Sequence, residues 1–378
     1  MEFNFRTVLG QLTSDEIRTL SRQADPTKTY LMNSLLPDRE VPSYKASGGN
    51  FSVTGTLASP VPMDTDFPEA GIMGIQTIEQ STFKFGASLL MPEKVLRELQ
   101  EMLKQMLSEG RSEGDKQRLM AGTAVNFFRE YVINPFDETR EYLKARAITE
   151  GLISYSSNKV EVAADYGVPV GNILATRAGV AAYNGNASVF LDDIKTARQK
   201  LGQDVRATLM NGDTLDSILN NPLHNFIVVA ESYSPDRTVR TVNVRQAVKL
   251  TGQTGVSALD ITPQSSYTFI GYSRTAKLFN PDDPNTPIAK KLIDDGRVVV
   301  IGNRLSTEII PRLNNDGGNT LGYYHVAPTV EGNGALGRWA EIYVPQEMPW
   351  SIRARAAENS IPMFDAASRV VLLKSATI

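Results

Sequence analysis

Histidine is the side chain most often used for acid–base and zinc chemistry near neutral pH, and this sequence contains two of them, His224 and His325. They lie far apart in the chain, and neither belongs to an HExxH pair that would place two ligands on one helix face. The sequence also lacks the GxSxG elbow of hydrolases and the GxxxxGK[ST] phosphate loop. We therefore expect no catalytic residue and no zinc site.

One stretch matches a cofactor motif by its letters. Gly332, Gly334 and Gly337 in "GNGALG" fit the GxGxxG pattern of dinucleotide-binding folds. Such a site needs a helix after the glycines, because the helix N-terminus binds the pyrophosphate. Here the glycines precede "RWAEIYVP", which is typical of a strand. A flexible turn is the favoured interpretation, and a nucleotide-binding enzyme is the less favoured alternative.

Neighbouring acidic residues are the remaining candidates for chemistry. Asp64 and Asp66 in "MDTD" could bind a hard cation such as calcium, but they lie in a Pro-rich loop where a solvated acidic tip is the simpler interpretation. Three further pairs are interpreted as solvated helix ends and turns: Asp192-Asp193, Asp282-Asp283 and Asp294-Asp295. We expect no metal and no cofactor.

Composition narrows the possible classes of protein. The chain has 378 residues, enough for about two compact units. It has no cysteine, which excludes disulfides and thiolate metal sites. The net charge is −3 and no cluster of Lys and Arg occurs, so phosphate-based binding of nucleic acid is not expected. We also expect neither a signal peptide nor a transmembrane helix.

The clearest structural signal is an oversized β-hairpin. Apolar and polar residues alternate on both sides of the Pro-rich segment 60–71, as in strands with one buried face. Hairpin loops usually have about two to five residues, so this loop is unusually long. The apolar positions are Phe51, Val53, Leu57, Ile75, Ile78, Phe83 and Phe85.

The hairpin is flanked by an irregular N-terminal segment and a series of helices. Residues 1–47 indicate an extended arm, which packs either along another part of the chain or on a neighbouring subunit. The apolar stripe over 92–109 predicts a long helix that begins at Pro92 and ends at Gly110. A second helix is expected from Asp115 to a break at Asn134-Pro135, and a third over 137–150.

The second half of the chain shows mixed α and β patterns. Helices are expected over 188–202, 211–221 and 241–252, and strands over 152–157, 159–167, 205–210 and 297–303. Three strands close the sequence, over 339–345, 348–356 and 368–376. From about residue 172 the pattern is of α/β type and predicts a sheet with helices packed on it.

The order of these elements, together with four stretches, resembles the major capsid proteins of tailed phages. The stretches are "TYLMNSLLPDREVPSY", "FPEAGIMGIQTIEQSTFKFGASLL", "YLKARAITEGLISYSSNKVEVAADYGVPVGN" and "EMPWSIRARAAENSIPMFDAASRVVLLKSA". They are similar to the arm, the returning strand of the extended loop, the Arg-Ala, Gly and Val-Asp-Tyr-Gly signature and the C-terminal segment of the lambda-type major head protein family. The resemblance implies the Hong Kong 97-type capsid fold, whose fold class is α+β.

That fold implies a division of the chain into four parts. Residues 1–47 would form the N-terminal arm and 48–88 the extended β-hairpin loop. A peripheral domain with a long spine helix would comprise 89–170 and 340–378, and an axial domain would comprise 171–339. We expect two sets of side chains to be buried mainly between subunits. They are the apolar side chains of the arm and the seven apolar hairpin residues named above, from Phe51 to Phe85.

The implied function is that of a structural protein, not an enzyme. The resemblance implies a virion protein, made late, that assembles in the bacterial cytoplasm as hexamers and pentamers into an icosahedral head around double-stranded DNA. An encapsulin-like cargo compartment, which shares the fold, is the alternative. Implied partners are other copies of the chain, a decoration protein, a portal, and a scaffold or protease; no membrane is implied. Lys84 is the only lysine in the loop and lies near its base, so we expect no Lys–Asn cross-link between subunits.

Overall fold

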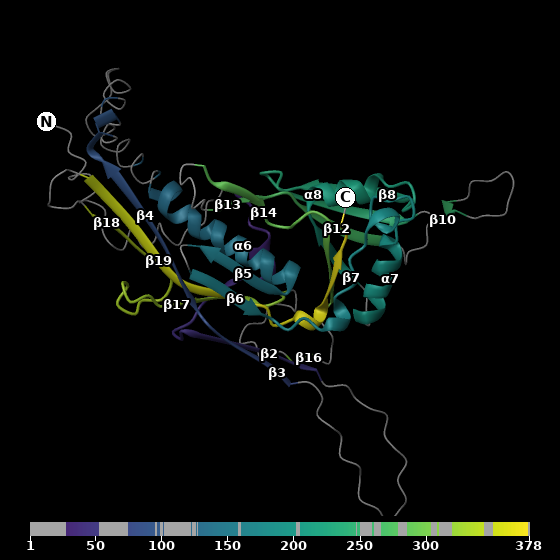
Figure 1. Cartoon of the computed structure of the whole chain (residues 1–378), viewed down its shortest axis with the longest axis horizontal. Helices are drawn as coiled ribbons and strands as arrows, with labels where there is room; N and C mark the ends of the chain where they lie inside the picture. Colours follow the sequence, from purple (N-terminus) through teal and green to yellow (C-terminus); the bar gives the residue numbers. More distant parts are fainter. Residues whose placement is uncertain are drawn as a thin grey trace, which may run out of the picture.

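A computed structural model describes most of the chain and shows an elongated molecule with two sheet-based units side by side (Figure 1). The described residues are 28–52, 75–94, 97–98, 101, 122, 126, 128–157, 160–201, 205–246, 248–249, 259–260, 266–278, 286–303, 308–309, 320–343 and 351–376. Within them, no helix is long and apolar enough to cross a membrane.

The first unit is built on the long strand β19 (Ser351–Met363). One of its partners is β4 (Phe83–Pro92), which pairs with it antiparallel over residues 351–360. β18 (Trp339–Tyr343) and β17 (Tyr323–Ala327) also pair with it, and β1 (Asp38–Glu40) joins β17 in parallel. The predicted strands at 339–345 and 348–356 are confirmed within the described residues.

Helix α6 (Asn134–Glu150) lies along this sheet and carries the hairpin of β5 (Leu152–Ser157) and β6 (Val160–Asp165) at its C-terminal end (Figure 1). The predicted break before it was wrong, because a π-helical turn, η1 (Arg129–Ile133), leads directly into α6. The Asn134 N–H donates to the Arg129 carbonyl, and Pro135 lies in the first turn of α6, where its missing N–H costs no helical hydrogen bond. A π turn thus lets the helix run up to the proline.

The long helix predicted over 92–109 falls mostly outside the described residues. Residues 93, 94, 97, 98 and 101 are described and all are helical. The Glu93–Arg97 and Lys94–Glu98 pairs lie one helical turn apart, as expected on an exposed helix face.

The second unit is a six-stranded sheet with the order β20-β15-β7-β12-β9-β8. Its strands are β7 (Val205–Met210), β8 (Phe226–Tyr233), β9 (Val239–Gln246), β12 (Ser266–Tyr272), β15 (Arg297–Gly302) and β20 (Val370–Lys374). The helices α7 (Phe190–Leu201) and α8 (Gly212–Asn220) confirm two predicted helices. They help to enclose an apolar core centred on Phe190, Leu215 and Phe269.

The predicted helix over 241–252 was wrong, because residues 241–246 belong to β9 and 248–249 form the short strand β10 (Val248–Lys249), paired with β11 (Leu259–Asp260). Val242 and Val244 are both buried, whereas Asn243 and Arg245 between and beyond them are exposed. This alternation has the two-residue period of a strand, which the helix interpretation ignored.

Smaller elements join the two units. β13 (Thr275–Leu278) and β14 (Ile288–Lys291) form a hairpin next to α6 in Figure 1. The last strand, β20, pairs with β15 in the second unit, although residues 340–363 lie in the first. The two sheets thus share the C-terminal segment, while the division of the chain into domains stays a prediction.

The third sheet contains the predicted hairpin. β2 (Lys45–Ser52) pairs with β3 (Ile75–Ser81), and β16 (Glu308–Ile309) pairs with the far end of β2. In Figure 1 this sheet extends away from the lower side of the molecule. The described hairpin is therefore shorter at its base than predicted, because Phe83 and the residues after it pair with β19 instead.

Residues 28–40 of the predicted arm belong to the core of the same chain. Helix α3 (Met32–Leu35) and the following Leu36 are packed in the first unit, with Met32 and Leu36 fully buried. β1 then adds a strand to the sheet. The expectation that apolar side chains of the arm are buried on a neighbouring subunit was wrong for this stretch; residues 1–27 lie outside the described residues.

Candidate functional site

The two histidines have structural surroundings. His224 is buried between the rings of Phe190 and Phe226; its Nδ1 lies 2.8 Å from the Ile218 carbonyl oxygen and its Nε2 2.9 Å from Ser188 Oγ. His325 Nε2 lies 2.7 Å from the Ser43 carbonyl oxygen. Burial lowers the pKa of both imidazoles, which favours the neutral form. Both rings therefore act as packed hydrogen-bonding groups.

The glycine motif forms a turn, as predicted. Residues 332–337 lie between β17 and β18, and Asn333, Gly334 and Gly337 all have positive φ. A strand follows them, so the helix N-terminus that a dinucleotide site requires is not present at this position.

The interpretation of the acidic pairs as solvated helix ends and turns was wrong for Asp193. This residue is 2% exposed and accepts hydrogen bonds from Arg177 at 2.5 and 3.0 Å and from the Tyr183 hydroxyl at 3.3 Å. Asp294 lies at a turn with its side chain 38% exposed, and it accepts two hydrogen bonds from Arg146, at 2.7 and 3.0 Å. Asp64, Asp66, Asp282 and Asp283 lie outside the described residues. Within the described part, no group of three metal-ligating side chains comes together.

Helix α6 is the centre of a buried ionic network that the sequence did not reveal. Glu358 on β19 is 1% exposed and accepts hydrogen bonds from Arg140 Nε at 2.9 and 3.2 Å. Arg338 donates from Nε to the same carboxylate at 3.1 Å and from Nη2 to Asp137 at 2.7 Å. Burial would raise the pKa of Glu358, but Arg140 and Arg338 outweigh it and hold the pKa at about 2.

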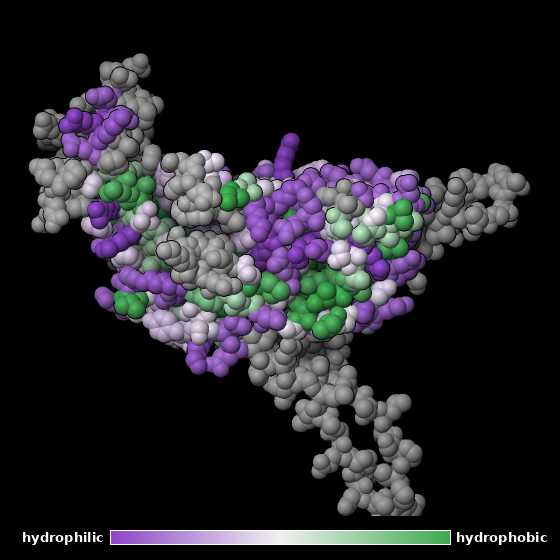
Figure 2. Space-filling model, viewed as in Figure 1, coloured by the Kyte–Doolittle hydropathy of each residue, from purple (hydrophilic) through white to green (hydrophobic). Residues whose placement is uncertain are grey.

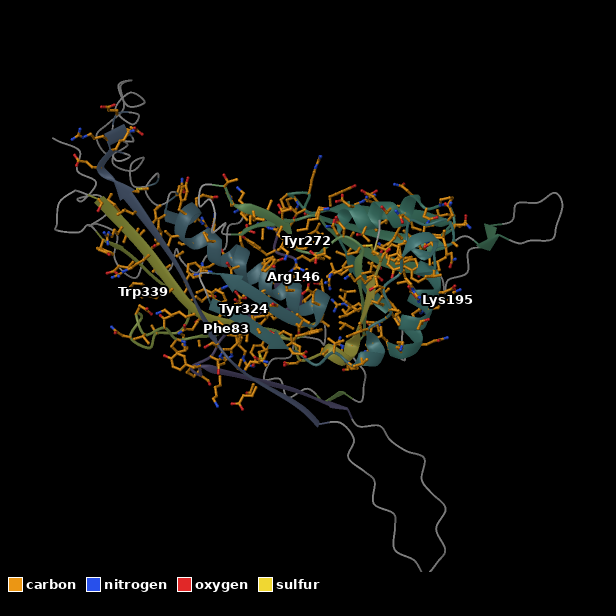
Figure 3. The ribbon with its side chains drawn as sticks, viewed as in Figure 1. Phe83, Arg146, Lys195, Tyr272, Tyr324 and Trp339 are labelled. Atoms are coloured by element: carbon orange, nitrogen blue, oxygen red, sulfur yellow. The ribbon has the colours of Figure 1, made fainter. Side chains whose placement is uncertain are left out.

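The network continues to the N-terminal segment. Asp38 on β1 accepts hydrogen bonds from Arg140 and, at 2.6 Å, from the fully buried Lys144, which also donates to Asn33. Both cations lie beside the ring of Tyr324, labelled in Figure 3 close to α6. Three acids and three bases thus balance one another in a cluster that joins β1, α6 and β19 and is buried except at Asp38 and, in part, Arg140.

Two further sets of ion pairs connect α6 to the second unit. Arg146, labelled in Figure 3, binds both Glu150 and Asp294, and Arg274 binds Glu138 at 2.6 Å. Because Asp294 precedes β15 and Arg274 follows β12, the helix is tied to the six-stranded sheet as well as to the first unit. The described part of the molecule is therefore one firmly connected frame.

Glu141 occupies the junction of three segments. Its Oε1 accepts hydrogen bonds from the Met32 N–H at 2.9 Å and from the Tyr272 hydroxyl at 2.6 Å, so it connects α6, α3 and β12. Tyr272 is labelled in Figure 3 just above the helix. The other oxygen, Oε2, is buried and has no hydrogen-bond partner among the described residues. Burial raises the pKa of Glu141 to about 7, despite these hydrogen bonds and the nearby Lys144 and Arg274.

We expect Glu141→Gln to stabilise the chain above neutral pH. A folded-state pKa of about 7, above the ordinary value of 4.5, means that the folded chain binds more protons between these values, so stability falls as pH rises from about 4.5 to 7. The amide keeps the Oε1 acceptor and removes the titration. Urea unfolding should show no difference near pH 4 and a gain of up to about 3 kcal/mol at pH 8.

The unmodified chain, measured at both pH values in parallel, is the reference for this change. If Glu141→Gln and the unmodified chain have the same pH profile, the buried carboxyl at the junction does not titrate as described.

The hairpin is anchored at its base. Ala46 on β2 is fully buried in the core of the first unit, and the Tyr323 hydroxyl donates to the Ser47 carbonyl oxygen at 2.8 Å. A Cβ on Gly48 would lie 1.9 Å from Oδ1 of Asp365, so only glycine lets β2 pass this close to the turn before β20. The hairpin thus leaves the body in a fixed direction.

Beyond Gly48 the ladder of β2 and β3 continues away from the body of the chain (Figure 1). Phe51 pairs with Ile75 and Gly48 with Ile78 across the ladder, and Ile309 pairs with Phe51 on the other side. A narrow sheet of this kind is marginal in water on its own, because it buries few apolar side chains. Packing against another chain would stabilise this sheet.

The seven predicted contact residues fall into three groups. Phe83, labelled in Figure 3, and Phe85 lie on β4 of the first unit, are half-buried and pack partly against the cores of the same chain. Phe51, Ile75 and Ile78 lie on the β2–β3 ladder. Val53 and Leu57 lie outside the described residues. Contact of these seven positions with a neighbouring subunit stays a prediction.

Sequence reasoning missed a further surface on β8. This strand forms one edge of the six-stranded sheet, and its apolar residues are exposed: Ile227, Val228, Val229 and Tyr233. The signal was present in the sequence as the run "FIVVA", which is typical of a buried strand. A core-like strand that is exposed on the single chain indicates a surface that another chain covers.

Comparison with known proteins establishes the fold. No family model matches the sequence, and no curated protein matches it. Among solved structures, the chain is similar to the protein assigned as the capsid protein of a prophage in E. coli CFT073, with a TM-score of 0.56 over 97% of this chain and 99% of the other. The two sequences are 11% identical. The predicted α+β phage-capsid fold is thereby confirmed.

Two more distant likenesses add no argument, since their TM-scores are below 0.5. A phage-related protein from Bordetella bronchiseptica RB50 matches with a TM-score of 0.44 and 13% identity, covering 95% of both chains. An encapsulin complex from Synechococcus elongatus PCC 7942 matches with a TM-score of 0.42 and 9% identity, covering 99% of this chain and 95% of the other.

Proposed function

We propose that this chain is the major capsid protein of a tailed phage, which assembles as hexamers and pentamers into an icosahedral head around double-stranded DNA. The observation that carries the proposal is the hairpin of β2 and β3, which is fixed at Gly48 but extends beyond the cores of its own chain. The fold shared with the prophage protein supports the same function.

The described body of the chain suits a shell subunit because ion pairs connect its parts. The network around Glu358 and the ion pairs of Arg146 and Arg274 tie α6 to both units. A subunit that keeps its shape presents its contact surfaces in fixed relative positions, which lowers the ordering cost of assembly. Many weak contacts of this kind give a shell that is stable in sum.

The charge of this chain favours a protein that encloses DNA over a protein that binds DNA tightly. The net charge is −3, and the loop 48–86 carries Asp64, Asp66, Glu69 and Glu79 against Lys84. Such a subunit would enclose packaged DNA without binding it tightly, because phosphate binding requires clustered cations. Lys84 forms an ion pair with Glu331 of its own chain, which supports a shell without Lys–Asn cross-links.

Assembly would involve further phage proteins. A shell without covalent links gains from reinforcement, so a decoration protein on its outer surface belongs to the proposal, as do a portal and a scaffold or protease during assembly in the bacterial cytoplasm. An encapsulin-like compartment remains the second candidate on the same fold, and the content of the particle, DNA or a protein cargo, separates the two.

Expression of the unmodified chain in bacteria tests the proposal directly. We expect closed shells, tubes or rings of subunits in electron micrographs of the purified protein. The same particles should separate into monomers on a denaturing gel, since no covalent link is expected. Monomers as the sole product, at concentrations where phage heads assemble in cells, would contradict the proposal.

A further inference from the structure

Strand β8 is an exposed edge strand of the second unit. Ile227, Val228, Val229 and Tyr233 are 36%, 46%, 54% and 57% exposed. Among the described residues, β8 pairs with β9 alone, so its outer edge has no strand beside it. Adjacent apolar side chains at this level of exposure are unusual for a strand of a monomeric protein.

The opposite edge of the same sheet carries a second exposed apolar surface. Residues 170–180 run along the outer side of β20, where Ile173 bridges to Leu372 and Arg177 bridges to Ser375. This segment exposes Val170 (86%), Ile173 (49%) and Val180 (68%). Figure 2 shows hydrophobic side chains both near β8 and near the lower end of β20.

Both edges are closed to simple strand addition. A register shift between Val228 and Ala230 marks a bulge in β8, which interrupts a regular ladder. On the other side, the segment 170–180 already takes hydrogen bonds along β20, from Leu174 N–H to the Leu372 oxygen and from Arg177 N–H to the Lys374 oxygen. Contact at either edge therefore has to use side chains.

We propose that the β8 edge of one copy packs against the 170–180 segment of the next copy, so that the second units form a closed head-to-tail ring. The inference rests on the proposed function, since it takes the occupant to be a second copy of this chain. Two different patches on opposite sides of one subunit produce a heterologous contact, and a heterologous contact that closes makes a ring. If each patch paired with itself, the chain would need two independent two-fold contacts.

Hydrogen bonds within the chain fix the backbone of the 170–180 segment before any such contact forms. Asn172 Nδ2 donates to the carbonyl oxygens of Ser368 and Val370 at 3.1 and 3.0 Å, and Lys200 donates to the Gly171 oxygen. The apolar side chains are therefore displayed on a fixed backbone, and little order has to be gained on binding.

The contact is too small to hold two copies together alone. An eight-residue strand is about 26 Å long, and with a width of about 10 Å the patch covers far less than the roughly 800 Å² per partner of a stable interface. A single pair of copies should therefore dissociate readily, and the ring should persist only where the hairpin contacts add to it.

Cysteine cross-linking tests this arrangement cleanly, because the chain has no cysteine of its own. The test variant, called the reporter, carries both Val229→Cys and Val180→Cys. Particles assembled from it are treated with a short bis-maleimide. The two edges of one chain are about six strand spacings apart, roughly 29 Å, so a short reagent cannot join them within one copy. Controls are Val229→Cys alone and Val330→Cys with Val180→Cys, since Val330 is an exposed valine of the first unit.

We expect the reporter to give a ladder that ends at five and six subunits on a denaturing gel, whereas both controls stay largely monomeric. Dimers from Val229→Cys alone would show that β8 pairs with itself and overturn the inference. Intact shells without any reporter ladder would also overturn it while leaving the proposed function in place. The absence of both particles and cross-links would contradict both.

Discussion

Replacement of residues 50–76 by Asn-Gly is expected to leave a folded chain that no longer assembles. The two new residues would join Gly49 and Thr77, which face each other in the ladder, and Asn-Gly is the preferred sequence for a tight hairpin turn. The deleted part contains no residue of the described cores, whereas the anchor at Ala46 and Gly48 is kept. Unfolding free energy should therefore change by no more than about 1 kcal/mol.

The trimmed variant is assayed by circular dichroism, urea unfolding and electron microscopy. We expect native unfolding behaviour together with a complete loss of particles. Two point variants refine the result: Phe51→Ser should weaken assembly, and Gln76→Ser, a polar change next to it across the ladder, should not. Normal shells from the trimmed chain would show that the hairpin is dispensable, and an unfolded trimmed chain would show that it belongs to the subunit core.

Glu358→Gln is expected to cost about 3 to 5 kcal/mol of folding stability, because it removes the buried carboxylate that the guanidinium groups of Arg140 and Arg338 share. The effect should depend on pH. With a folded-state pKa of about 2, below the ordinary 4.5, the contribution of Glu358 is present above about pH 4.5 and is lost as pH falls through about 2. Urea unfolding at pH 7 and pH 3 measures both parts.

The matched control is Glu341→Gln. Glu341 also accepts a hydrogen bond from an arginine, Arg355 at 2.9 Å across β18 and β19, but the side chains of this pair are 41% and 52% exposed. An exposed pair of this kind contributes about 0 to 1 kcal/mol. Equal losses from the two variants would mean that burial does not set the strength of the Glu358 network.

The local pattern of the chain predicted elements whose own sequence determines them. The helix α8 has Asn211 as its N-cap, with the side chain accepting from the Asp213 N–H, and α7 has acids in its first turn and bases in its last. The strands β15 and β20 were visible as apolar runs. In each case the signal lies within about a dozen residues, so no distant partner is needed to find it.

The errors concern residues whose environment comes from distant parts of the chain. Asp193 looks like a solvated acid in the sequence, but it is buried and paired with an arginine 16 residues away, and the arginine that pairs with the partly exposed Asp294 is 148 residues away. The burial of Glu358 beside Arg140 likewise depends on a contact over 218 residues. Charge pairing of this kind has no periodicity, which is why the network around α6 could not be predicted.

The assembly surfaces show the same limit in a different form. The hairpin was visible because its length is abnormal for the chain that carries it. The exposure of β8 was not visible, because "FIVVA" has the composition of an interior strand and only the sheet order places it at an edge. A sequence pattern predicts which apolar residues are buried, but it does not tell whether their own chain or another chain buries them.

Electron cryo-microscopy of particles formed by the unmodified chain tests the central claim, that the hairpin is completed by a neighbouring copy. We predict an icosahedral shell in which β2 and β3 lie against the next subunit, with Phe51 and Ile75 covered by that subunit. A map in which this hairpin folds back onto its own chain, or touches no neighbour, would contradict the account.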